Sequence, residues 1–288
     1  MIKFQTRIGP GFYTTPTFEG MFFPAGEAHV KVINENEDKG PLTEIARVYG
    51  YSADDLMLLA MWADYCVARG SETVVIMPYF PGARQDRGLP FGLGVYASII
   101  ETMDLNQLIV FDPHSEALHG RLTENFPDAV TIVDSRRVIR DHVVGRADRD
   151  DKAQAYDGII CPDQGAQKRS QAVADVVHLP LFQARKHRDE STGQLSGFTI
   201  EELPSEGRFL VVDDICDGGG TFMGLAAASG LPKERLGLYV SHGVFSGKAP
   251  QLLDAFGEIF TTNSYPSSRG IATHEINIDP YLYGAIKK

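Results

Sequence analysis

Cysteine is scarce in this chain of 288 residues. Its three cysteines, Cys66, Cys161 and Cys216, lie far apart, and none belongs to the close pairs that are typical of zinc sites. An odd, scattered set argues against a disulfide framework and fits a reducing compartment. We therefore expect each thiol to be a small buried hydrophobic group.

Long hydrophobic runs are also missing. The longest strongly apolar stretch, Leu56 to Ala63, ends at Asp64 and is far shorter than the roughly 20 residues that cross a bilayer. The segment from Met1 to Pro16 lacks a basic region followed by a continuous apolar core, so no secretory signal is expected. These absences predict a cytoplasmic protein with no membrane partner.

Positive charge is in short supply, with 27 Lys and Arg against 38 Asp and Glu and a net charge of −11. Because no local basic stripe offsets this deficit, a nucleic acid partner is not expected. The 43% of hydrophobic residues is ordinary for a folded protein and far from the composition of disorder. There is no repeat of fixed period. At roughly 150 residues per domain, the length predicts two domains with separate cores.

Short β-branched runs alternate with helical patterns along most of the chain. This alternation predicts an α/β fold with parallel sheets flanked by helices. The domain boundary is expected between Asp134 and Asp157, where the charge-dense run 146–152 indicates a solvated loop. Asp54 is placed to cap the first helix. The predicted strands are 73–79, 108–112, 158–163 and 209–214, and the predicted helices are 54–69, 91–103, 167–175 and 221–229.

The most informative strand end lies at 210–221, where an apolar strand runs into two aspartates and then a loop of three glycines that opens a helix. Such a loop lets backbone N–H groups approach a phosphate, and the helix adds its positive N-terminal end. The two aspartates suit sugar hydroxyls, and a third lies at the mouth of the loop. A tight turn with helix-capping aspartates is the simpler alternative. The residues concerned are Asp213, Asp214, Asp217, Gly218, Gly219, Gly220 and Thr221.

Two strand ends in the first half also carry polar groups. Arg84, Gln85 and Asp86 follow a strand and a Pro-Gly turn, and their cation, amide and carboxylate suit the phosphates and base edge of a nucleotide. His114 lies just past the strand at 108–112 and offers a ring nitrogen to a metal or to phosphate. Taken alone, each has an ordinary alternative as a surface or structural group.

Two further features of the second half suit charge neutralisation. Asp163 ends a predicted strand and is placed to take a hard cation such as Mg²⁺, although a turn aspartate is the alternative. Lys186 and Arg188 border the polar stretch 187–197, which indicates a mobile loop or a hairpin flap. Two cations on a flap can close over a transferring group and exclude water. Without that context, the same cluster would be a solvated basic run.

The glycine loop resembles the phosphoribosyl-diphosphate (PRPP) signature of type I phosphoribosyltransferases and of ribose-phosphate diphosphokinases, the PRPP synthetases. Other segments, in family order, favour the diphosphokinases, because a simple phosphoribosyltransferase has no reason to carry the Arg-Gln-Asp segment. The matching segments are Phe23-Pro-Ala-Gly-Glu27, Val32-Ile-Asn-Glu-Asn36, Pro78 to Arg87, Phe111 to Glu116, Cys161 to Arg169, Ala184 to Arg188 and His242 to Gly247.

The resemblance implies two type I phosphoribosyltransferase-like domains over 1–140 and 141–270, with a tail over 271–288 that packs on the first. It implies Mg²⁺-dependent transfer of the β,γ-diphosphoryl group of ATP to the anomeric hydroxyl of ribose 5-phosphate, which gives PRPP and AMP. It also implies a homo-oligomer whose ATP site is shared with a neighbouring subunit. The residues it implicates are Lys186, Arg188 and His114 in catalysis, Phe23, Glu27, Arg84, Gln85, Asp86 and His114 in ATP binding, and His114 and Asp163 as metal ligands.

Some positions depart from the family pattern. Ala25 replaces an aspartate and removes an acceptor for the adenine amino group, which leaves the choice of nucleotide open. Ala166 replaces the second glycine after Asp163, and the short segment after Arg87 predicts that the family's usual allosteric site is lost. Gly218 replaces a threonine that would donate to the 5-phosphate, and this opens space there.

Two alternatives to PRPP synthesis therefore stay open. In the first, the same chemistry acts on an extended ribose 5-phosphate such as ADP-ribose, as in NAD salvage. In the second, the chain is a non-catalytic PRPP-synthetase-associated regulatory subunit. The retention of flap cations together with His114 and Asp163 argues against a catalytically silent subunit.

Overall fold

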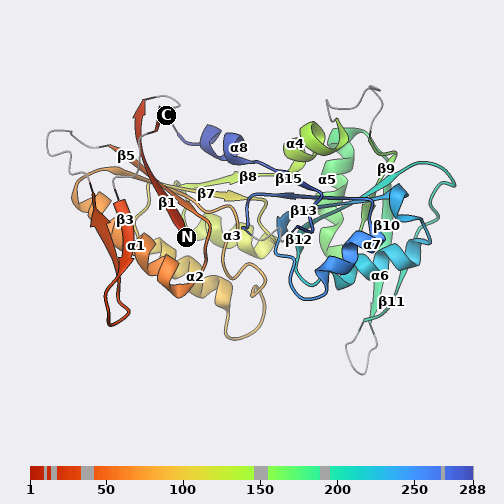
Figure 1. Ribbon diagram of the computed structural model, residues 1–288, viewed down its shortest axis with the longest axis horizontal. Helices are drawn as coiled ribbons and strands as arrows, with labels where there is room; N and C mark the ends of the chain where they lie inside the picture. The colour runs from red at the N-terminus through yellow and green to blue at the C-terminus, as the bar shows by residue number, and fades with distance from the viewer. Residues whose placement is uncertain are drawn as a thin grey trace. The chain divides into compact units, whose positions relative to one another are not determined.

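The computed structural model describes residues 1–9, 12–13, 18–33, 42–145, 155–188, 195–266 and 270–287. The chain forms two α/β units, Met1–Val133 with Asp279–Lys288, and Asp134–Ile278 (Figure 1). The change of unit at 133/134 lies close to the expected boundary at 140. The segment 271–278 belongs to the second unit, so the part of the tail that joins the first unit begins at Asp279 rather than at 271. The run 146–152 lies outside the described residues.

The first unit contains a six-stranded sheet in the order β2-β1-β5-β6-β7-β8. β5 to β8 are parallel, whereas β1 pairs antiparallel with both β5 and β2. The parallel strands have the buried, β-branched sequences typical of a sheet covered on both faces. The strands are β1 (Ile2–Gly9), β2 (Phe12–Tyr13), β5 (Thr43–Val48), β6 (Glu72–Ile76), β7 (Gln107–Phe111) and β8 (Val130–Val133).

Three helices of the first unit share one hydrophobic core with this sheet: α1 (Ala53–Ala68), α2 (Gly92–Glu101) and α3 (Glu116–Asn125). Helix α1 begins at a capping box, in which the Ser52 hydroxyl accepts from the amide of Asp55 and the Asp55 carboxylate accepts from the amide of Ser52. Ser52 therefore caps this helix, not Asp54 as the sequence suggested. Trp62 of α1 stacks on Phe4 of β1 with ring centroids 5.7 Å apart, so the helix packs against the antiparallel strand as well.

The second unit contains a seven-stranded sheet in the order β11-β10-β9-β12-β13-β14-β15. Every neighbouring pair is parallel except β10 and β11, which form an antiparallel hairpin. Its strands are β9 (Gly158–Cys161), β10 (Leu181–Arg188), β11 (Leu195–Ile200), β12 (Phe209–Cys216), β13 (Leu236–Gly243), β14 (Glu258–Thr262) and β15 (His274–Ile276).

Helices cover both faces of the second sheet (Figure 1). On one face, α6 (Gly220–Ser229) and α7 (Leu252–Ala255) bury Phe222, Leu225 and Leu252 against β12 and β13. On the other face, α5 (Gln167–Val177) contacts β9 and β12, and α4 (Arg136–Ile139), which continues as a π-helix over Arg140–Val144, packs beside it. The four predicted strands and four predicted helices are thus present, with ends that differ by a few residues.

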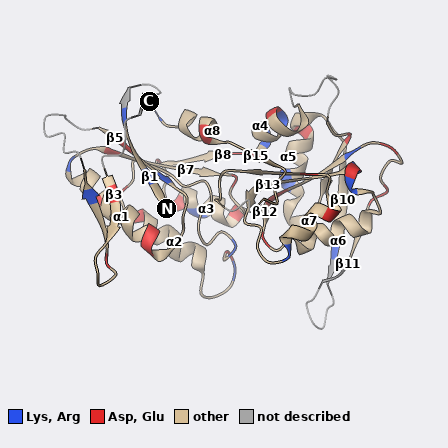
Figure 2. Cartoon of the chain, in the orientation of Figure 1, with Lys and Arg blue, Asp and Glu red and all other residues tan. Residues whose placement is uncertain are grey.

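The three cysteines are buried free thiols, as expected, and burial raises the pKa of Cys161 to about 11. Basic and acidic side chains are interspersed over the described parts of both units (Figure 2). Within the same residues, none of the helices is long and apolar enough to span a bilayer.

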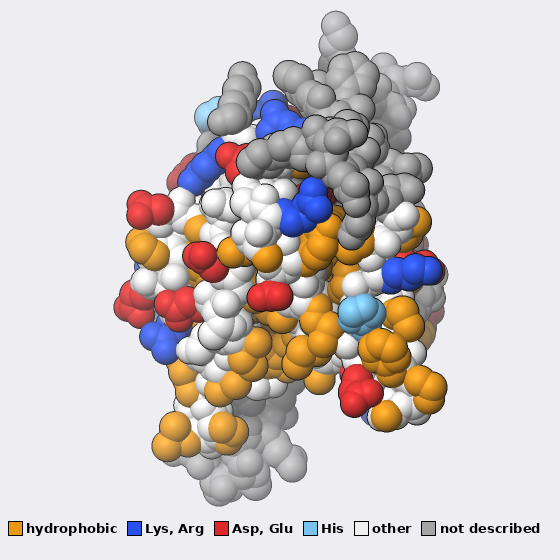
Figure 3. Space-filling view, turned by 90° about the vertical axis from the view of Figure 1, so that its left-hand side faces the viewer, with side chains coloured by type: hydrophobic (Ala, Val, Ile, Leu, Met, Phe, Trp, Pro, Cys, Tyr) orange, Lys and Arg blue, Asp and Glu red, His pale blue; other side chains and the backbone are white. Residues whose placement is uncertain are grey.

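A separate two-stranded hairpin, β3 (Phe18–Phe22) with β4 (Ala28–Val32), packs on α1. Its inner face contributes Phe18 and Val30 to the core of the first unit. Figure 3 shows hydrophobic side chains on this end of the molecule. The large hydrophobic side chains exposed on the hairpin, just after it and on α1 are Phe22, Phe23, Ile33, Met57 and Val67.

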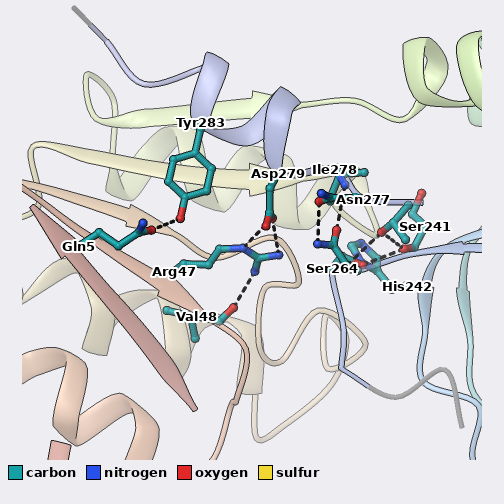
Figure 4. Close-up of polar contacts among 12 residues, drawn as sticks. Gln5, Arg47, Val48, Ser241, His242, Ser264, Asn277, Ile278, Asp279 and Tyr283 are labelled. Atoms are coloured by element: carbon teal, nitrogen blue, oxygen red, sulfur yellow. Dashed lines mark hydrogen bonds and ion pairs between the residues drawn. The ribbon is translucent and has the colours of Figure 1, made fainter. Parts of the chain in front are cut away.

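The C-terminal helix α8 (Asp279–Gly284) is held on the first sheet by polar contacts (Figure 4). Arg47 of β5 is fully buried, and its guanidinium lies 3.3 Å from the Asp279 carboxylate. The same guanidinium donates to the carbonyl of Val48 at 2.9 Å and lies over the ring of Tyr49. The hydroxyl of Tyr283 in α8 donates to Gln5 of β1. The first sheet therefore has the returning C-terminus on the face opposite to α1.

We predict that Asp279→Asn lowers the free energy of unfolding by about 2–3 kcal/mol, because it leaves the buried Arg47 cation without its counter-charge. The loss should fall below the roughly 3–5 kcal/mol of a fully buried pair, since the Asp279 side chain is 30% exposed. Urea denaturation of the full chain measures it. Glu275→Gln removes an exposed acidic charge from the same tail and should change stability by less than about 0.5 kcal/mol. Equal losses in the two variants would contradict this role of the pair.

Candidate active site

Four neighbouring parallel strands bring their carboxyl ends to one edge of the second sheet. In the order β10-β9-β12-β13, the described segments at these ends contain Lys186, Asp163, the loop 213–221 and the loop 243–247. Ligands of open parallel sheets bind at this edge. Side chains that are far apart in the sequence therefore meet at the place where the fold class predicts a site.

The ammonium group of Lys186 joins three of these segments. It donates a hydrogen bond of 2.8 Å to the hydroxyl of Thr221 in the first turn of α6, and it lies 3.8 Å from Oδ2 of Asp163. The side chains of Lys186 and Asp163 are 20% and 31% exposed, so the charges are shielded but reachable from solvent. Asp163 and the glycine loop thus lie at the same edge, not at opposite ends of the sheet.

Asp163 is held by the chain that follows it. Its Oδ1 accepts from the amides of Gly165 at 2.9 Å and Ala166 at 3.2 Å, which caps a short 3-10 helix over Gln164–Ala166. Its other oxygen faces Lys186. The capping alternative for this residue is therefore real, but it occupies one oxygen and leaves the second oriented toward the flap.

Asp213 and Asp214, at the end of β12, have different environments. Asp214 is buried and forms an ion pair with Arg169 at 3.3 Å. Asp213 accepts the backbone amide of Asp214 at 2.9 Å. Burial, and then the neighbouring Asp214 carboxylate, raises the pKa of Asp213 well above its ordinary value. The pair therefore offers carboxylate oxygens to a ligand at a cost in stability.

The glycine loop has the backbone geometry of an anion site. Gly219 adopts a φ of 78°, a left-handed conformation that favours glycine, and a Cβ there would lie 3.2 Å from the side chain of Leu252. Gly219 is followed directly by α6, whose first amides have no partner within the helix. At Gly218, by contrast, a Cβ would meet no atom within 4 Å. The space expected from the sequence at Gly218 is present.

Most of the predicted nucleotide-binding residues lie at the corresponding edge of the first sheet. Arg84, Gln85 and Asp86 follow β6, and His114 follows β7, its parallel neighbour. The amide of Phe111 donates to the carbonyl of Pro78 at 3.1 Å, so the two strand ends run together. Arg84 and Gln85 are exposed, whereas Asp86 and His114 are half-buried.

Phe23 and Glu27 lie apart from that edge, in the turn of the separate β3–β4 hairpin, where the amide of Phe23 donates to the carbonyl of Glu27 at 2.9 Å. Both side chains are exposed. The hairpin is not part of the six-stranded sheet, so the sheet does not bring these two residues to the Arg84 segment. The motif residues 34–36 lie outside the described residues.

The predicted flap is an antiparallel hairpin of β10 and β11, which places Lys186 opposite Phe198. Arg188 ends β10, but its side chain and the tip over 189–194 lie outside the described residues. The two predicted metal ligands belong to different units, with His114 in the first and Asp163 in the second. In the described part of the chain, there is no group of three or more His, Cys, Asp or Glu side chains that could hold a metal ion by themselves.

Arg169 is a functional candidate that the sequence argument did not assign. It lies in the first turn of α5, and its side chain is only 15% exposed because it reaches across to Asp214. Its neighbour Ser170 donates to the carbonyl of Val212 at 3.3 Å, which fixes α5 against β12. The available signal was an arginine six residues after Asp163, but only the sheet order shows that it faces the acidic pair.

Known proteins resemble this chain in sequence and in fold. No protein-family model matches the chain. A ribose-phosphate pyrophosphokinase of Thermococcus kodakarensis is 26% identical over 253 residues, which cover 85% of this chain and 84% of the relative. Ribose-phosphate pyrophosphokinase 2 of Schizosaccharomyces pombe is 27% identical over 222 residues, which cover 74% of this chain but only 66% of the relative. The crystal structure of phosphoribosylpyrophosphate synthetase from Mycobacterium smegmatis superposes with a TM-score of 0.75 over 94% of this chain and 89% of that chain, at 21% identity.

The chain is thus similar in sequence to ribose-phosphate pyrophosphokinases and in fold to a phosphoribosylpyrophosphate synthetase. The resemblance seen in the motifs is thereby confirmed, and so is the α/β fold of type I phosphoribosyltransferase-like units. The roles of individual residues at the two sheet edges stay predictions.

We predict that Asp213→Asn stabilises the protein at pH 7 by more than about 1 kcal/mol. Because the pKa of Asp213 is raised in the folded state, folding is coupled to the uptake of a proton. The stability that the protonated Asp213 side chain contributes is lost as the pH rises through that pKa. Asparagine mimics the protonated form, so the gain should vanish toward pH 4. Urea denaturation across this pH range measures it, with the exposed Asp254→Asn as the matched control. A destabilised or pH-independent Asp213→Asn would contradict the assignment.

Proposed function

We propose that this protein transfers the β,γ-diphosphoryl group of ATP to the anomeric hydroxyl of a ribose 5-phosphate, giving a 1-diphosphate and AMP. The proposal rests on the contacts of the Lys186 ammonium with Thr221 and Asp163. They bring a cation of the flap, the glycine loop and a carboxylate together in one place. The relatives that bear the name ribose-phosphate pyrophosphokinase agree with this chemistry.

Each group has a part in positioning the acceptor. The amides of the glycine loop would hold the 5-phosphate at the start of α6. Asp213 and Asp214 would accept hydrogen bonds from the ribose hydroxyls, with Arg169 keeping Asp214 oriented. The anomeric hydroxyl oxygen then attacks the β-phosphorus and its proton passes to water. The bond from that phosphorus to the oxygen bridging the α- and β-phosphates breaks, which releases AMP. Such transfers depend chiefly on positioning and charge neutralisation.

Lys186 supplies a positive charge at the acceptor site. In the described structure its ammonium is shared between a neutral hydroxyl and a carboxylate 3.8 Å away. Phosphate oxygens would replace or join these partners, and charge that develops on the transferring group would be stabilised in a partly desolvated site. We expect Arg188, on the same strand, to add a second cation.

The residues present fit a magnesium ion that is held mainly by substrate. Asp163 offers one carboxylate oxygen that is not used by its capping hydrogen bonds, and Mg²⁺ typically takes one or two carboxylates together with phosphates and water. When bound, the ion would neutralise phosphate charge and orient the polyphosphate.

We assign ATP to the edge of the first sheet that carries Arg84, Gln85, Asp86 and His114. The exposed Phe23 and Glu27 on the β3–β4 hairpin would reach the nucleotide of a neighbouring copy, so we also propose a homo-oligomer. Ala25 in the turn of that hairpin leaves the base specificity of the donor open.

The direct test follows AMP released from ATP in the presence of ribose 5-phosphate and Mg²⁺. We predict that Lys186→Ala lowers kcat by at least about 100-fold with little change in nucleotide affinity, because it removes charge needed in the transition state. Arg185→Ala, which removes an exposed cation from the adjacent position of β10, serves as the control and should retain activity. Comparable turnover in wild type and Lys186→Ala would refute the role. No AMP with any ribose phosphate, despite nucleotide binding, would favour a regulatory subunit.

A second candidate acceptor is an extended ribose 5-phosphate such as ADP-ribose. The observation in its favour is Gly218, where a side chain would meet nothing within 4 Å and where the family carries threonine. Open space beside the expected 5-phosphate would let the phosphate carry a further group. The chemistry at the anomeric carbon would be unchanged.

If the acceptor is extended, we predict that Gly218→Thr shifts the ratio of kcat/KM for ADP-ribose to that for ribose 5-phosphate by at least tenfold toward ribose 5-phosphate. The threonine fills the open space and restores a hydroxyl donor, and Gly218→Ala should lie between the two. AMP release with each acceptor, with product masses determined, measures the ratio. Wild type that uses ribose 5-phosphate alone, with no change in preference in Gly218→Thr, would remove this candidate.

A further inference from the structure

The loop after β13 is hydrogen-bonded to the chain that leads into the glycine loop 217–221. The amides of Val244 and Phe245 both donate to the carbonyl of Cys216, at 2.9 and 3.0 Å, and the amide of Ser246 donates to the carbonyl of Asp217 at 3.0 Å. The family resemblance covers this segment, His242 to Gly247, but implies no role for it. Its hydrogen bonds place it directly against the start of the proposed phosphate site.

These backbone contacts determine the orientation of two peptide planes. In a trans peptide, the carbonyl and the following N–H point in opposite directions. Since the carbonyls of Cys216 and Asp217 face the segment 244–246, the amides of Asp217 and Gly218 face away from it. Successive amides that point to the same side form an anion-binding concavity. The hydrogen bonds from the segment 244–246 thus orient the amides of Asp217 and Gly218 toward the opposite side of the loop, where the phosphate would bind.

The side chain of Ser246 adds a contact that the backbone does not provide. Its hydroxyl donates to the carboxylate of Asp217, at the mouth of the loop. A carboxylate there would repel a phosphate if it turned toward the loop amides. The hydrogen bond from the Ser246 hydroxyl holds this negative charge on the side of the loop that faces the segment 244–246.

Ser246 is itself held in a rigid place. Phe245 is 1% exposed and adopts a left-handed φ of 48°, and its ring lies so close to Gly243 that a Cβ there would be 2.3 Å from it. On the other side, the carbonyl of Ser246 accepts from the amide of Ala249 at 3.0 Å. The buried aromatic ring and the following turn fix the position from which the serine reaches Asp217.

We infer that Ser246 is a positioning residue for the acceptor's phosphate, acting through Asp217 and not by touching the substrate. The inference rests on the proposed function, because it takes the loop 217–221 as the site of a sugar phosphate. It predicts an effect on the binding of the acceptor that is separate from the binding of ATP in the first unit.

The test measures ribose 5-phosphate binding by calorimetry, together with amide hydrogen exchange of the peptide that contains 217–221. We expect Ser246→Ala to weaken ribose 5-phosphate binding about tenfold, the size of a lost hydrogen bond to a charged group, and to speed exchange of the loop amides. Ser246→Thr, which keeps the hydroxyl, should stay within about threefold of wild type. ATP affinity should not change in either variant.

Two controls separate positioning from loss of fold or of function. Ser229→Ala removes a serine hydroxyl that donates to the carbonyl of Ala226 at the end of α6, and it should leave binding and loop exchange unchanged. In an Asp217→Ala background, Ser246→Ala should have little further effect, because the two residues act together. Wild type that binds ribose 5-phosphate yet forms no AMP would overturn the proposed reaction and leave this inference standing. Unchanged binding and exchange in Ser246→Ala, or a wild type that binds no ribose 5-phosphate, would overturn the inference.

Discussion

The ammonium of Lys186 is the contact on which the proposed active site depends. It lies between the hydroxyl of Thr221 and the carboxylate of Asp163, and so connects three segments that are far apart in the chain. The sheet order makes this possible, because β10, β9 and β12 are adjacent and parallel and end at one edge. A partly desolvated cation that is shared by two oxygen groups can accept phosphate oxygens with little rearrangement of the protein.

A site with several carboxylates can bind an anionic substrate only if their negative charges are neutralised or oriented away from it. Asp214 is neutralised by Arg169, Asp163 is capped by two amides and faces Lys186, and Asp217 is turned toward Ser246. Asp213 carries an electrostatic cost, since burial and the neighbouring Asp214 carboxylate raise its pKa. Perturbed carboxylates of this kind are typical of functional sites, where stability is lost for the sake of binding.

Much of this arrangement could be predicted from the sequence, for identifiable reasons. The strands at 158–161 and 209–216 are continuous apolar runs that end in acidic residues, and parallel sheets collect such ends at one edge. The antiparallel pairing of β1 with β5 was not predicted, since these strands are distant in sequence, and the β3–β4 hairpin was not predicted either. The return of the tail to the first unit was expected only from the family resemblance. Arg47 and Asp279, 232 positions apart, show no local signal at all. Arg169 and Ser246 were missed as well, because their partners are set by strand order and not by spacing.

We propose that one edge of the second sheet holds a sugar phosphate between the glycine loop and the Lys186 flap. The decisive measurement is a crystal structure of the protein with ribose 5-phosphate bound. We expect the 5-phosphate on the amides of the loop 217–221, the ribose hydroxyls on Asp213 and Asp214, and the anomeric carbon on the side of Lys186 and Asp163. A sugar phosphate bound away from this loop, or with its anomeric carbon turned away from Lys186, would show that this edge does not hold the acceptor as proposed.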